Sequence, residues 1–341
     1  MKVLMLIEEV REPGGTSGKA GGAESLLRDI SAGLRWRGHE IIWWYGQDTL
    51  AEAIERHKPD ICQINTIHNR FGMQPALYLQ RHNIPHVWVL MDYWPFCGGR
   101  MLLQDNQRVS CPAVDGVCDP NCTAQGQGIV ARGPAPRQYL ETVNGSYVVA
   151  LNRNTANIYK RNGVRVDAVI GCGVDAERFH PEPGKHEWGS VIASSAFPQY
   201  PTKGFHILKE AADRLKINVR VITGTSREQV AELLQSGSIF VFPSTYEETW
   251  GLCLTEAMAT GLACIASNVC GPRAQITDGQ NGRLFANRNV GELAGILAEL
   301  LDDAAEQKRL GDNARAWVEQ NATLDIMASR YEKLYKAVLN G

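Results

Sequence analysis

Two glutamates eight positions apart, Glu248 and Glu256, are the residues of this chain best suited to hold a ligand by its hydroxyl groups. An apolar run over residues 238–243 ends shortly before Glu248, and a helix that would contain Glu256 is expected to begin after Gly251. This order is typical of the strand, loop and helix corner at which open α/β sheets bind nucleotides. One carboxylate could accept hydrogen bonds from a sugar and the other from ribose hydroxyls. A solvated acidic loop before an ordinary amphipathic helix is the alternative interpretation.

The expected helix start would supply backbone donors to the same ligand. The first N–H groups of a helix have no intrahelical partner and lie at the positive end of its dipole, so they suit a phosphate group. The predicted donor-binding stretch consists of Thr249, Trp250, Gly251 and Leu252.

Lys203 precedes Gly204 at the start of another expected helix. A cation there could neutralise a pyrophosphate leaving group as the bond to the sugar breaks. A solvent-exposed lysine with no contact to a ligand is the alternative.

A glycine-rich loop over residues 13–22 follows the first expected strand. Its glycines, including the adjacent Gly21 and Gly22, would let the backbone approach a bound group without a Cβ in the way. The loop is not a G-x-G-x-x-G fingerprint, and a flexible surface turn is the alternative.

Strands and helices alternate along the chain, which predicts parallel βαβ units and the α/β class. In the first half, the expected strands cover residues 3–7, 40–45, 61–65, 86–91, 147–151 and 166–170, with helices over 23–37 and 155–161. In the second half, strands over 190–194, 219–223, 238–243 and 263–267 precede or separate helices over 204–215, 227–234, 291–302, 304–320 and 325–339. A chain of 341 residues exceeds the size at which one core stops growing, so two domains are expected, joined by the Gly- and Pro-containing segment 171–184.

Composition describes an ordinary globular protein, with 44% hydrophobic and 21% charged residues. The net charge of −2 provides no field for nucleic acid, which makes a nucleic-acid partner unexpected. The cluster Arg28, Arg35, Arg37 and His39 could meet an anionic surface, although a solvated helix face is the favoured interpretation. The sequence shows neither a signal-peptide pattern nor an apolar run of about eighteen residues, so we expect a cytoplasmic protein, with peripheral membrane contact as a further option.

Four cysteines, Cys97, Cys111, Cys118 and Cys122, fall in a segment without clear secondary structure. Four thiolates could close a structural zinc site and order a long loop. The spacing C-x13-C-x6-C-x3-C is not a standard finger pattern, so free thiols or a redox-labile pair are equally open.

The stretch PSTYEETWGLCLTEAMATGLACIAS resembles the E-x7-E signature of retaining GT-B-fold glycosyltransferases of family 4, the glycosyl transferases group 1. The likeness extends over nearly the whole chain. In the first half it includes KVLMLIEE, GGAESLLRDISAGLRWRGHEI and PDICQINTIHN, and in the second TKGFHILKEAADRL and DGQNGRLF.

The resemblance implies a GT-B fold, with two Rossmann-like doubly wound parallel-sheet domains facing across a cleft. Residues 1–175 would form the acceptor-side domain, with a Cys-rich loop over 97–122. Residues 185–322 would form the nucleotide-sugar donor domain, and a helix over 323–341 would cross back to the first domain.

The resemblance also assigns roles and exposes two departures. Gly21 and Gly22 match the family's glycine pair, and Lys203 matches the lysine of its K-G element. Family members often carry an arginine a few residues before that lysine, and residues 194–200 contain none. Met91 stands where the family usually has histidine, which leaves Asp92 as the nearest ionisable candidate.

His68 is a second candidate for the acceptor or sugar side, because it follows an expected strand at the sheet edge where ligands bind. A satisfied structural histidine is the alternative.

These features together predict an enzyme, a retaining hexosyl- or glycosyltransferase acting in polysaccharide biosynthesis. It would move a sugar from a nucleotide-diphosphate sugar to a hydroxyl of a glycan or lipid-linked acceptor, with no cofactor required for catalysis. Glu248 and Lys203, with Asp92, are the predicted catalytic residues. A sugar-nucleotide epimerase, a non-catalytic nucleotide-sugar binding subunit, and transfer to a small metabolite or modified nucleic-acid base are the alternatives. The sequence fixes neither the donor base, the acceptor nor the oligomeric state.

Overall fold

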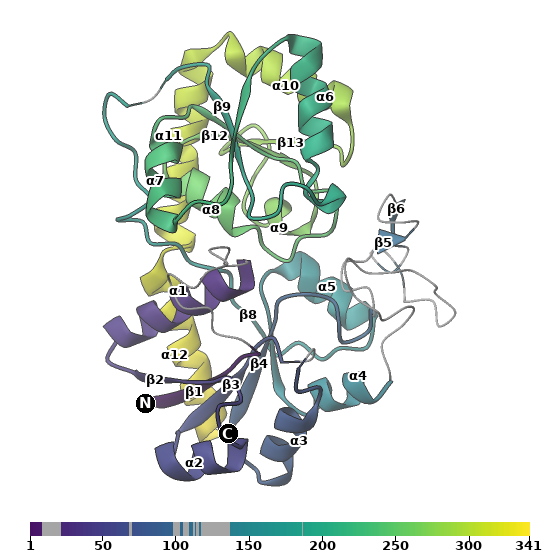
Figure 1. Ribbon diagram of the computed structural model, residues 1–341, viewed down its shortest axis with the longest axis vertical. Coiled ribbons are helices and arrows are strands. Elements are labelled where there is room, and N and C mark those ends of the chain that lie inside the picture. Colours follow the sequence, from purple (N-terminus) through teal and green to yellow (C-terminus); the bar gives the residue numbers. More distant parts are fainter. Residues whose placement is uncertain are drawn as a thin grey trace. The chain divides into compact units, whose positions relative to one another are not determined.

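The computed structural model describes residues 1–8, 22–67, 70–97, 103–104, 109–111, 113, 116, 137–185 and 187–341. The chain divides into two compact units (Figure 1). Unit 1 takes in residues 1–8, the described residues from Ala23 to Gly171, and Asp325–Gly341. Unit 2 contains Cys172–Leu324.

The sheet of unit 1 is parallel throughout, in the order β2-β1-β3-β4-β7-β8. Its strands are β1 (Lys2–Leu6), β2 (Glu40–Trp44), β3 (Ile61–Ile64), β4 (His86–Leu90), β7 (Tyr147–Ala150) and β8 (Ala168–Val169). The central strands β3 and β4 are mostly apolar and are buried along their whole length, as expected for a parallel sheet covered by helices on both faces.

The helices of unit 1 are α1 (Gly22–Trp36), α2 (Leu50–His57), α3 (Gln74–Arg81), α4 (Arg137–Asn144), α5 (Arg153–Arg161) and α12 (Leu324–Asn340). Local sequence fixes several of their starts: Thr49 and Glu52 form a capping box on α2, and Asn152 caps α5. A short antiparallel ribbon, β5 (Leu103–Gln104) and β6 (Val109–Ser110), lies outside the main sheet.

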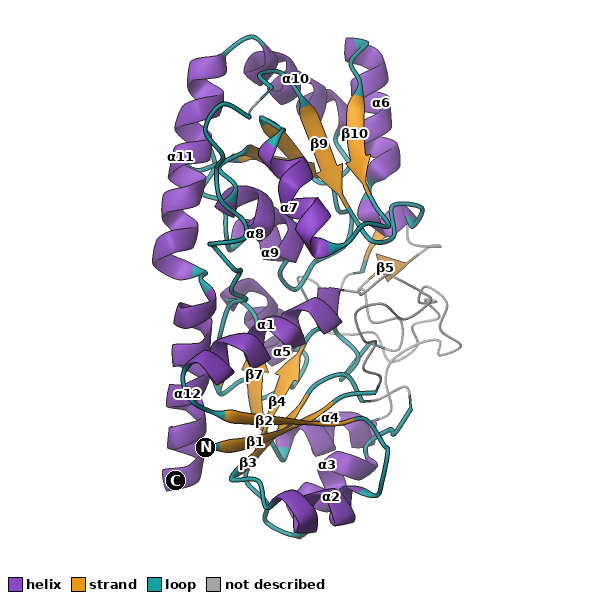
Figure 2. Ribbon diagram, turned by 60° about the vertical axis from the view of Figure 1, so that its left-hand side comes forward, coloured by secondary structure: helices purple, strands orange, loops and turns teal. Residues whose placement is uncertain are grey.

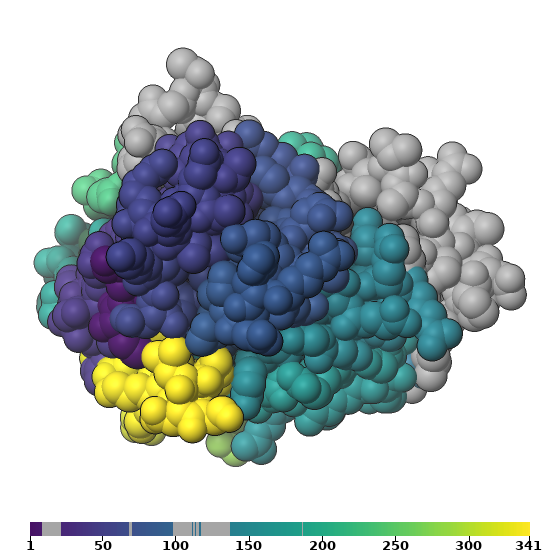
Figure 3. Space-filling view, turned by 90° about the horizontal axis from the view of Figure 1, so that it is seen from below, coloured from purple at the N-terminus to yellow at the C-terminus, as the bar shows by residue number. Residues whose placement is uncertain are grey.

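The C-terminal helix α12 packs on unit 1, to which residues 325–341 belong. The Tyr335 hydroxyl hydrogen-bonds the carboxamide of Gln63, which lies in the middle of β3, and both groups are buried. At the surface, Arg37 pairs with Asp325 at 2.8 Å and Glu332 at 2.7 Å. In Figure 3 the yellow C-terminal residues lie directly against the purple and teal segments of the same unit.

Unit 2 has a parallel sheet in the order β10-β9-β11-β12-β13, with helices on both faces (Figure 2). Its strands are β9 (Val191–Ser194), β10 (Val219–Ile222), β11 (Ile239–Phe242), β12 (Ala263–Ser267) and β13 (Arg283–Phe285). Its helices are the 3₁₀ turn η2 (Pro201–Lys203), α6 (Phe205–Leu215), α7 (Arg227–Gln235), α8 (Leu252–Ala259), α9 (Cys270–Arg273), α10 (Val290–Leu301) and α11 (Ala304–Asn321).

The strand order of unit 2 decides where a ligand can bind. The second strand of the unit, β10, lies on one side of β9, and the third, β11, lies on the other. The chain therefore reverses its winding between β9 and β11, and ligands of open α/β sheets bind in the crevice at the carboxyl ends of such a pair.

The predicted α/β class, with two doubly wound parallel sheets, is confirmed. The expected strand over residues 166–170 is shorter, since only Ala168–Val169 pair with β7. Among the residues described here, no helix is long and apolar enough to cross a membrane.

Candidate functional site

Glu248 lies at the centre of a hydrogen-bond cluster in the loop between β11 and α8. The Lys203 ammonium group is 2.7 Å from its Oε1. The Ser244 hydroxyl donates to the same oxygen at 3.2 Å, and the Tyr246 hydroxyl donates to Oε2 at 2.5 Å. Three donors thus hold one carboxylate in a single orientation, which is the preorganisation that a binding or catalytic group needs.

A glycine contact sets the position of Lys203. Lys203 ends η2, and Gly204 follows with φ of +70°. A Cβ on Gly204 would lie 1.7 Å from the carbonyl oxygen of Pro243, at the end of β11. Gly204 therefore allows the backbone of the loop before α6 to contact the backbone of the loop after β11. As a result, Lys203 in the first loop reaches Glu248 in the second.

The environment keeps this cluster ionised at Lys203 and neutral at Tyr246. Burial by itself would lower the pKa of Lys203, but Glu248 and Tyr246 outweigh it and the pKa is raised. Burial, reinforced by Glu248, raises the pKa of the Tyr246 phenol, which therefore stays a hydrogen-bond donor. The Lys203 ammonium also lies 4.9 Å from the centre of the Tyr246 ring.

Glu256, on the second turn of α8, pairs with Arg227. The guanidinium Nε and Nη2 lie 3.0 Å and 2.9 Å from Glu256 Oε1. Arg227 is the first residue of α7, whose start is fixed by a capping box between Ser226 and Gln229. The sequence analysis missed this arginine, although its place directly after the β10 loop puts it at the ligand-binding edge of the sheet.

The start of α8 presents unpaired backbone donors. Among the residues that the structure describes, no acceptor pairs with the backbone N–H groups of Trp250, Gly251 or Leu252. Gly251 has φ of +99°, and a Cβ there would lie 3.0 Å from the Phe242 ring. The expected set of free N–H groups is therefore present, at the turn between Glu248 and the helix.

The Trp250 side chain faces the interior. Its indole N–H donates to the Thr255 hydroxyl at 2.9 Å, and that hydroxyl donates to Gln275 Oε1 at 2.8 Å. Gln275 Nε2 donates back to the Trp250 carbonyl at 2.8 Å. This closed, buried network fixes the turn, so Trp250 contributes to the site through its backbone.

Glu247 and Glu248 have separate tasks although they are adjacent. Glu247 Oε2 accepts the backbone N–H of Cys270 at 2.8 Å and so holds the start of α9. Gly271 allows α9 to approach, because a Cβ there would lie 2.1 Å from the Trp250 carbonyl oxygen. Glu247 therefore holds the start of α9 against this loop, while Glu248 pairs with Lys203.

A small cavity of about 30 Å³ lies beside the Lys203 side chain, lined in part by Ser194, Ser195, Ser244 and Cys253. Burial raises the pKa of the Cys253 thiol to about 12, with a further contribution from Glu256, so the thiol stays protonated at neutral pH. The segment without the family's arginine borders this cavity, and serine hydroxyls stand at its edge instead.

The candidate residues of unit 1 lie at the carboxyl ends of its strands where they are described. Asp92 follows β4, and its carboxylate accepts the backbone N–H of Trp94 at 3.0 Å. Its carbonyl oxygen accepts the Tyr159 hydroxyl at 2.9 Å. Gly22 is the first residue of α1, whereas Gly21 and His68 lie outside the described residues.

The cysteine cluster is described only in part. Cys97 and Cys111 belong to the described residues, whereas Cys118 and Cys122 lie outside them. Within the described ranges, no group of three or more His, Cys, Asp or Glu side chains could hold a metal ion.

The geometry of unit 2 suits an anionic ligand that also carries hydroxyl groups. Lys203 and the α8 start offer positive charge and N–H donors at the switch point, and Glu248 offers an ordered carboxylate beside them. Glu256 and Arg227 form a second charged pair on the same edge. A cation next to an acceptor for hydroxyls is what a sugar attached to a diphosphate requires.

A family model described as glycosyl transferases group 1 matches residues 201–317. The chain is 31% identical over 201 residues to the MMP alpha-(1->4)-mannosyltransferase of Mycolicibacterium hassiacum, covering 50% of this chain and 48% of that relative. It is 32% identical over 138 residues to the N-acetyl-alpha-D-glucosaminyl L-malate synthase of Bacillus anthracis, covering 40% of this chain and 35% of that enzyme. The chain thus spans less than half the length of these curated relatives.

Solved structures match the fold over the full chain. A sucrose-phosphate synthase from Thermosynechococcus elongatus has a TM-score of 0.75 at 14% identity and covers 99% of both chains. HepE from Anabaena, solved in complex with UDP and glucose, has a TM-score of 0.70 at 17% identity, with 99% of this chain and 100% of that chain covered. At these identities the likeness concerns the fold.

Proposed function

We propose that the chain is a retaining glycosyltransferase that uses a nucleotide-diphosphate sugar, because residues 201–317 match the family model described as glycosyl transferases group 1. The observation that carries this proposal is the contact between Lys203 and Glu248 at the switch point of unit 2. In this proposal Lys203 would be the cation for the diphosphate, and Glu248 beside it would be the carboxylate for the sugar.

The donor would bind along the carboxyl edge of the unit 2 sheet. Lys203 and the N–H groups of Trp250, Gly251 and Leu252 would stabilise the negative charge of the leaving diphosphate. This set does the work that a magnesium ion does in other transferases, so no metal is required for the transfer. Thr249 lies in the same turn, between these donors and Glu248.

The two glutamates of the signature would hold the two sugars of the donor. Glu248 would accept hydrogen bonds from hydroxyls of the transferred sugar, with Ser244 and Tyr246 keeping its carboxylate in place. Glu256 would accept hydrogen bonds from the ribose, steadied by Arg227.

Transfer with retention would proceed on one face of the sugar. The bond from the anomeric carbon to the phosphate oxygen breaks, and a bond to the acceptor hydroxyl oxygen forms on the same face. The hydroxyl proton passes to the departing phosphate oxygen, so no separate base is needed. Asp92, at the carboxyl end of β4, is the ionisable group proposed for the acceptor side in the absence of the family's histidine.

The relatives suggest which ligands to test first. HepE is solved with UDP and glucose, so UDP-glucose is the first donor to examine. The curated relatives named above differ in what they glycosylate, and others are named D-inositol 3-phosphate glycosyltransferases. We propose a hydroxyl of a glycan or lipid-linked chain as the acceptor, with contact at a membrane surface for the latter.

The test is thermal stabilisation by UDP, GDP, ADP and their sugar conjugates, since a ligand that binds the folded state raises Tm by mass action. Glu256→Gln should lose the shift, whereas Glu210→Gln, at an exposed position of α6, should keep it. A selective shift lost in Glu256→Gln supports the donor site and identifies the base. An equal shift in both variants, or no shift in the native protein, would contradict it.

A second candidate is a nucleotide-sugar binding subunit without transferase activity. The observation that favours it is the pair of departures, Met91 and the arginine-free segment 194–200. Such a protein would show the nucleotide shift but neither transfer nor donor hydrolysis. An epimerase on the same fold would change the donor sugar with no acceptor present, which NMR of the donor would reveal.

A further inference from the structure

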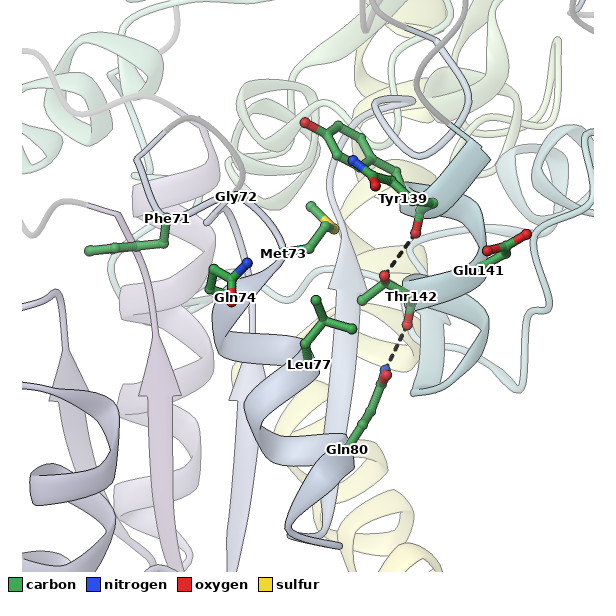
Figure 4. Close-up of a pocket in the computed structure, with 10 residues that line it drawn as sticks. Phe71, Gly72, Met73, Gln74, Leu77, Gln80, Tyr139, Glu141 and Thr142 are labelled. Carbon is green, nitrogen blue, oxygen red and sulfur yellow. Dashed lines mark hydrogen bonds between the residues drawn. The ribbon is translucent and has the colours of Figure 1, made fainter.

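Unit 1 contains a groove between α3 and α4 that no step of the proposed transfer uses. It has a volume of about 580 Å³, within the range of roughly 300 to 1,000 Å³ for small-molecule sites. Figure 4 shows side chains of α3, α4 and the turn before α3 around this space.

The spacing of residues on α3 creates one wall of the groove. Pro75, Ala76 and Leu79 are buried, so α3 turns another face toward α4. That face carries Gln74, Leu77 and Gln80, which recur every three residues on one side of the helix.

Hydrogen bonds and ring contacts order both ends of the groove before any ligand arrives. At one end, Gln80 Nε2 donates to the Thr142 carbonyl at 2.7 Å and to the Ser146 hydroxyl at 3.3 Å. At the other, the Phe71 ring packs on Trp44 with centroids 4.8 Å apart. Groups that are already fixed lose little entropy on binding.

The chemistry of the lining is neutral and mixed. It carries three carboxamides, from Gln74, Gln80 and Gln138, and a phenol from Tyr139, with apolar surface from Leu77 and Met73 among others. Among the described residues that line it there is no lysine, arginine or histidine, and the one carboxylic acid, Glu141, is exposed and pairs with Arg137 at 3.1 Å. The described lining therefore supplies no cation of its own to a phosphate or carboxylate, and its one charged group, Glu141, is already paired.

We propose that this groove binds a neutral oligosaccharide segment of the acceptor, at a distance along the glycan from the hydroxyl that reacts. A sugar chain offers hydroxyls to the carboxamides and C–H faces to the leucine, methionine and tyrosine. One part of the groove lies at a suitable edge, because α3 follows β3 and its first residue, Gln74, lines the groove on the carboxyl side of the sheet, as Asp92 does after β4. This inference rests on the proposed glycosyl transfer.

The experiment uses saturation-transfer NMR and calorimetry on the full chain, with neutral glucose oligomers of increasing length and glucuronate-containing oligomers as probes. Leu77→Arg places a long cation in the groove at a half-buried helix position. Leu339→Arg, at an exposed position of α12, is the matched control. We expect neutral oligomers to bind the native protein and Leu339→Arg alike, and Leu77→Arg at least about fivefold more weakly.

Nucleotide binding, followed on the same samples, separates this proposal from the proposed function. Nucleotide shifts without any oligosaccharide binding, or equal binding by native protein and Leu77→Arg, would overturn the groove and leave the donor site intact. Stronger binding of the glucuronate oligomers would also overturn it. If the protein bound oligosaccharides, Leu77→Arg weakened that binding, and no nucleotide bound, the groove proposal would stand and the proposed transferase function would be contradicted.

Discussion

Lys203 and Glu248 are separated by 45 positions in the chain, yet their ammonium and carboxylate groups meet at 2.7 Å. The strand order explains this contact, because β9 and β11 are neighbours and their loops leave the same edge of the sheet. The pair is largely withdrawn from solvent, with side-chain exposures of 26% and 9%. When no ligand is bound, each of these two charges is therefore compensated mainly by the other.

Replacing Lys203 by methionine should destabilise the protein and weaken donor binding. Removing one partner of a buried pair costs about 3 to 5 kcal/mol, and partial exposure of the lysine places the expected loss nearer 2 to 3 kcal/mol. Chemical denaturation measures it, with Lys209→Met on the exposed face of α6 as the control. The double variant Lys203→Met/Glu248→Gln should recover stability while transfer stays lost. If stability were unchanged in Lys203→Met, the pair would not be what orders this loop.

Tyr246→Phe should slow turnover more than it weakens donor binding. The hydroxyl holds Glu248 Oε2, so its loss leaves the carboxylate less well placed in the transition state, at a cost of about tenfold or more in kcat. The KM for the donor should change little, because Lys203 and the helix start remain. Tyr45→Phe, at an exposed position of unit 1, is the control. A rise of about tenfold in the KM for the donor, with kcat unchanged, would instead mean that Tyr246 acts in ground-state binding.

The sequence predicted the charged residues between β11 and α8 better than it predicted the side chains that hold them in position. The E-x7-E spacing and the K-G pair located Lys203, Glu248 and Glu256, because strand, loop and helix order follows from hydrophobic pattern and turn residues. Tyr246 and Arg227 were not identified from the sequence, because their contacts depend on which loops become neighbours once the strands are ordered in the sheet. Side-chain direction, which separates Glu247 from Glu248, is likewise settled only by the folded loop.

The groove of unit 1 was beyond sequence reasoning for a related reason. Helices α3 (Gln74–Arg81) and α4 (Arg137–Asn144) are eight residues each, which is shorter than the stretch of about 11 to 18 residues over which a helical period can be recognised. Far apart in the chain, they become adjacent only because β3, β4 and β7 are consecutive in the sheet.

Arg227→Gln should weaken nucleoside diphosphate binding. Without the guanidinium, Glu256 loses a hydrogen bond and an ion-pair contact at one carboxylate oxygen, and the orientation they impose. We expect an affinity lower by about tenfold, or about 1.4 kcal/mol. Arg220→Gln, at a half-exposed position on β10, is the control in calorimetric titrations. Unaltered affinity would show that Glu256 needs no positioning partner.

Transfer should continue in excess EDTA, because cations of the protein and the α8 start are proposed to carry the charge of the leaving group. Assays with and without chelator and added magnesium measure this directly. Elemental analysis of the same preparation tests the separate prediction of a structural zinc held by the four clustered cysteines. Activity that depends on added magnesium would contradict the metal-independent reaction, whatever the zinc content.

Two glycines with nearly the same positive φ allow the K-G contact to be tested by a matched pair of substitutions. Gly204 and Gly224 have φ of +70° and +69°, so alanine meets the same left-handed strain at both, about 1 kcal/mol. Only at Gly204 would the new Cβ lie 1.7 Å from the Pro243 carbonyl oxygen, while at Gly224 nothing described lies within 4 Å. Gly204→Ala must therefore move the loop that carries Lys203 away from β11. We expect it to lower Tm well beyond Gly224→Ala and to abolish the nucleotide-induced shift, which Gly224→Ala should retain. Similar losses of Tm and of nucleotide binding in the two variants would mean that backbone strain, rather than the contact between the two loops, sets the requirement for glycine at position 204.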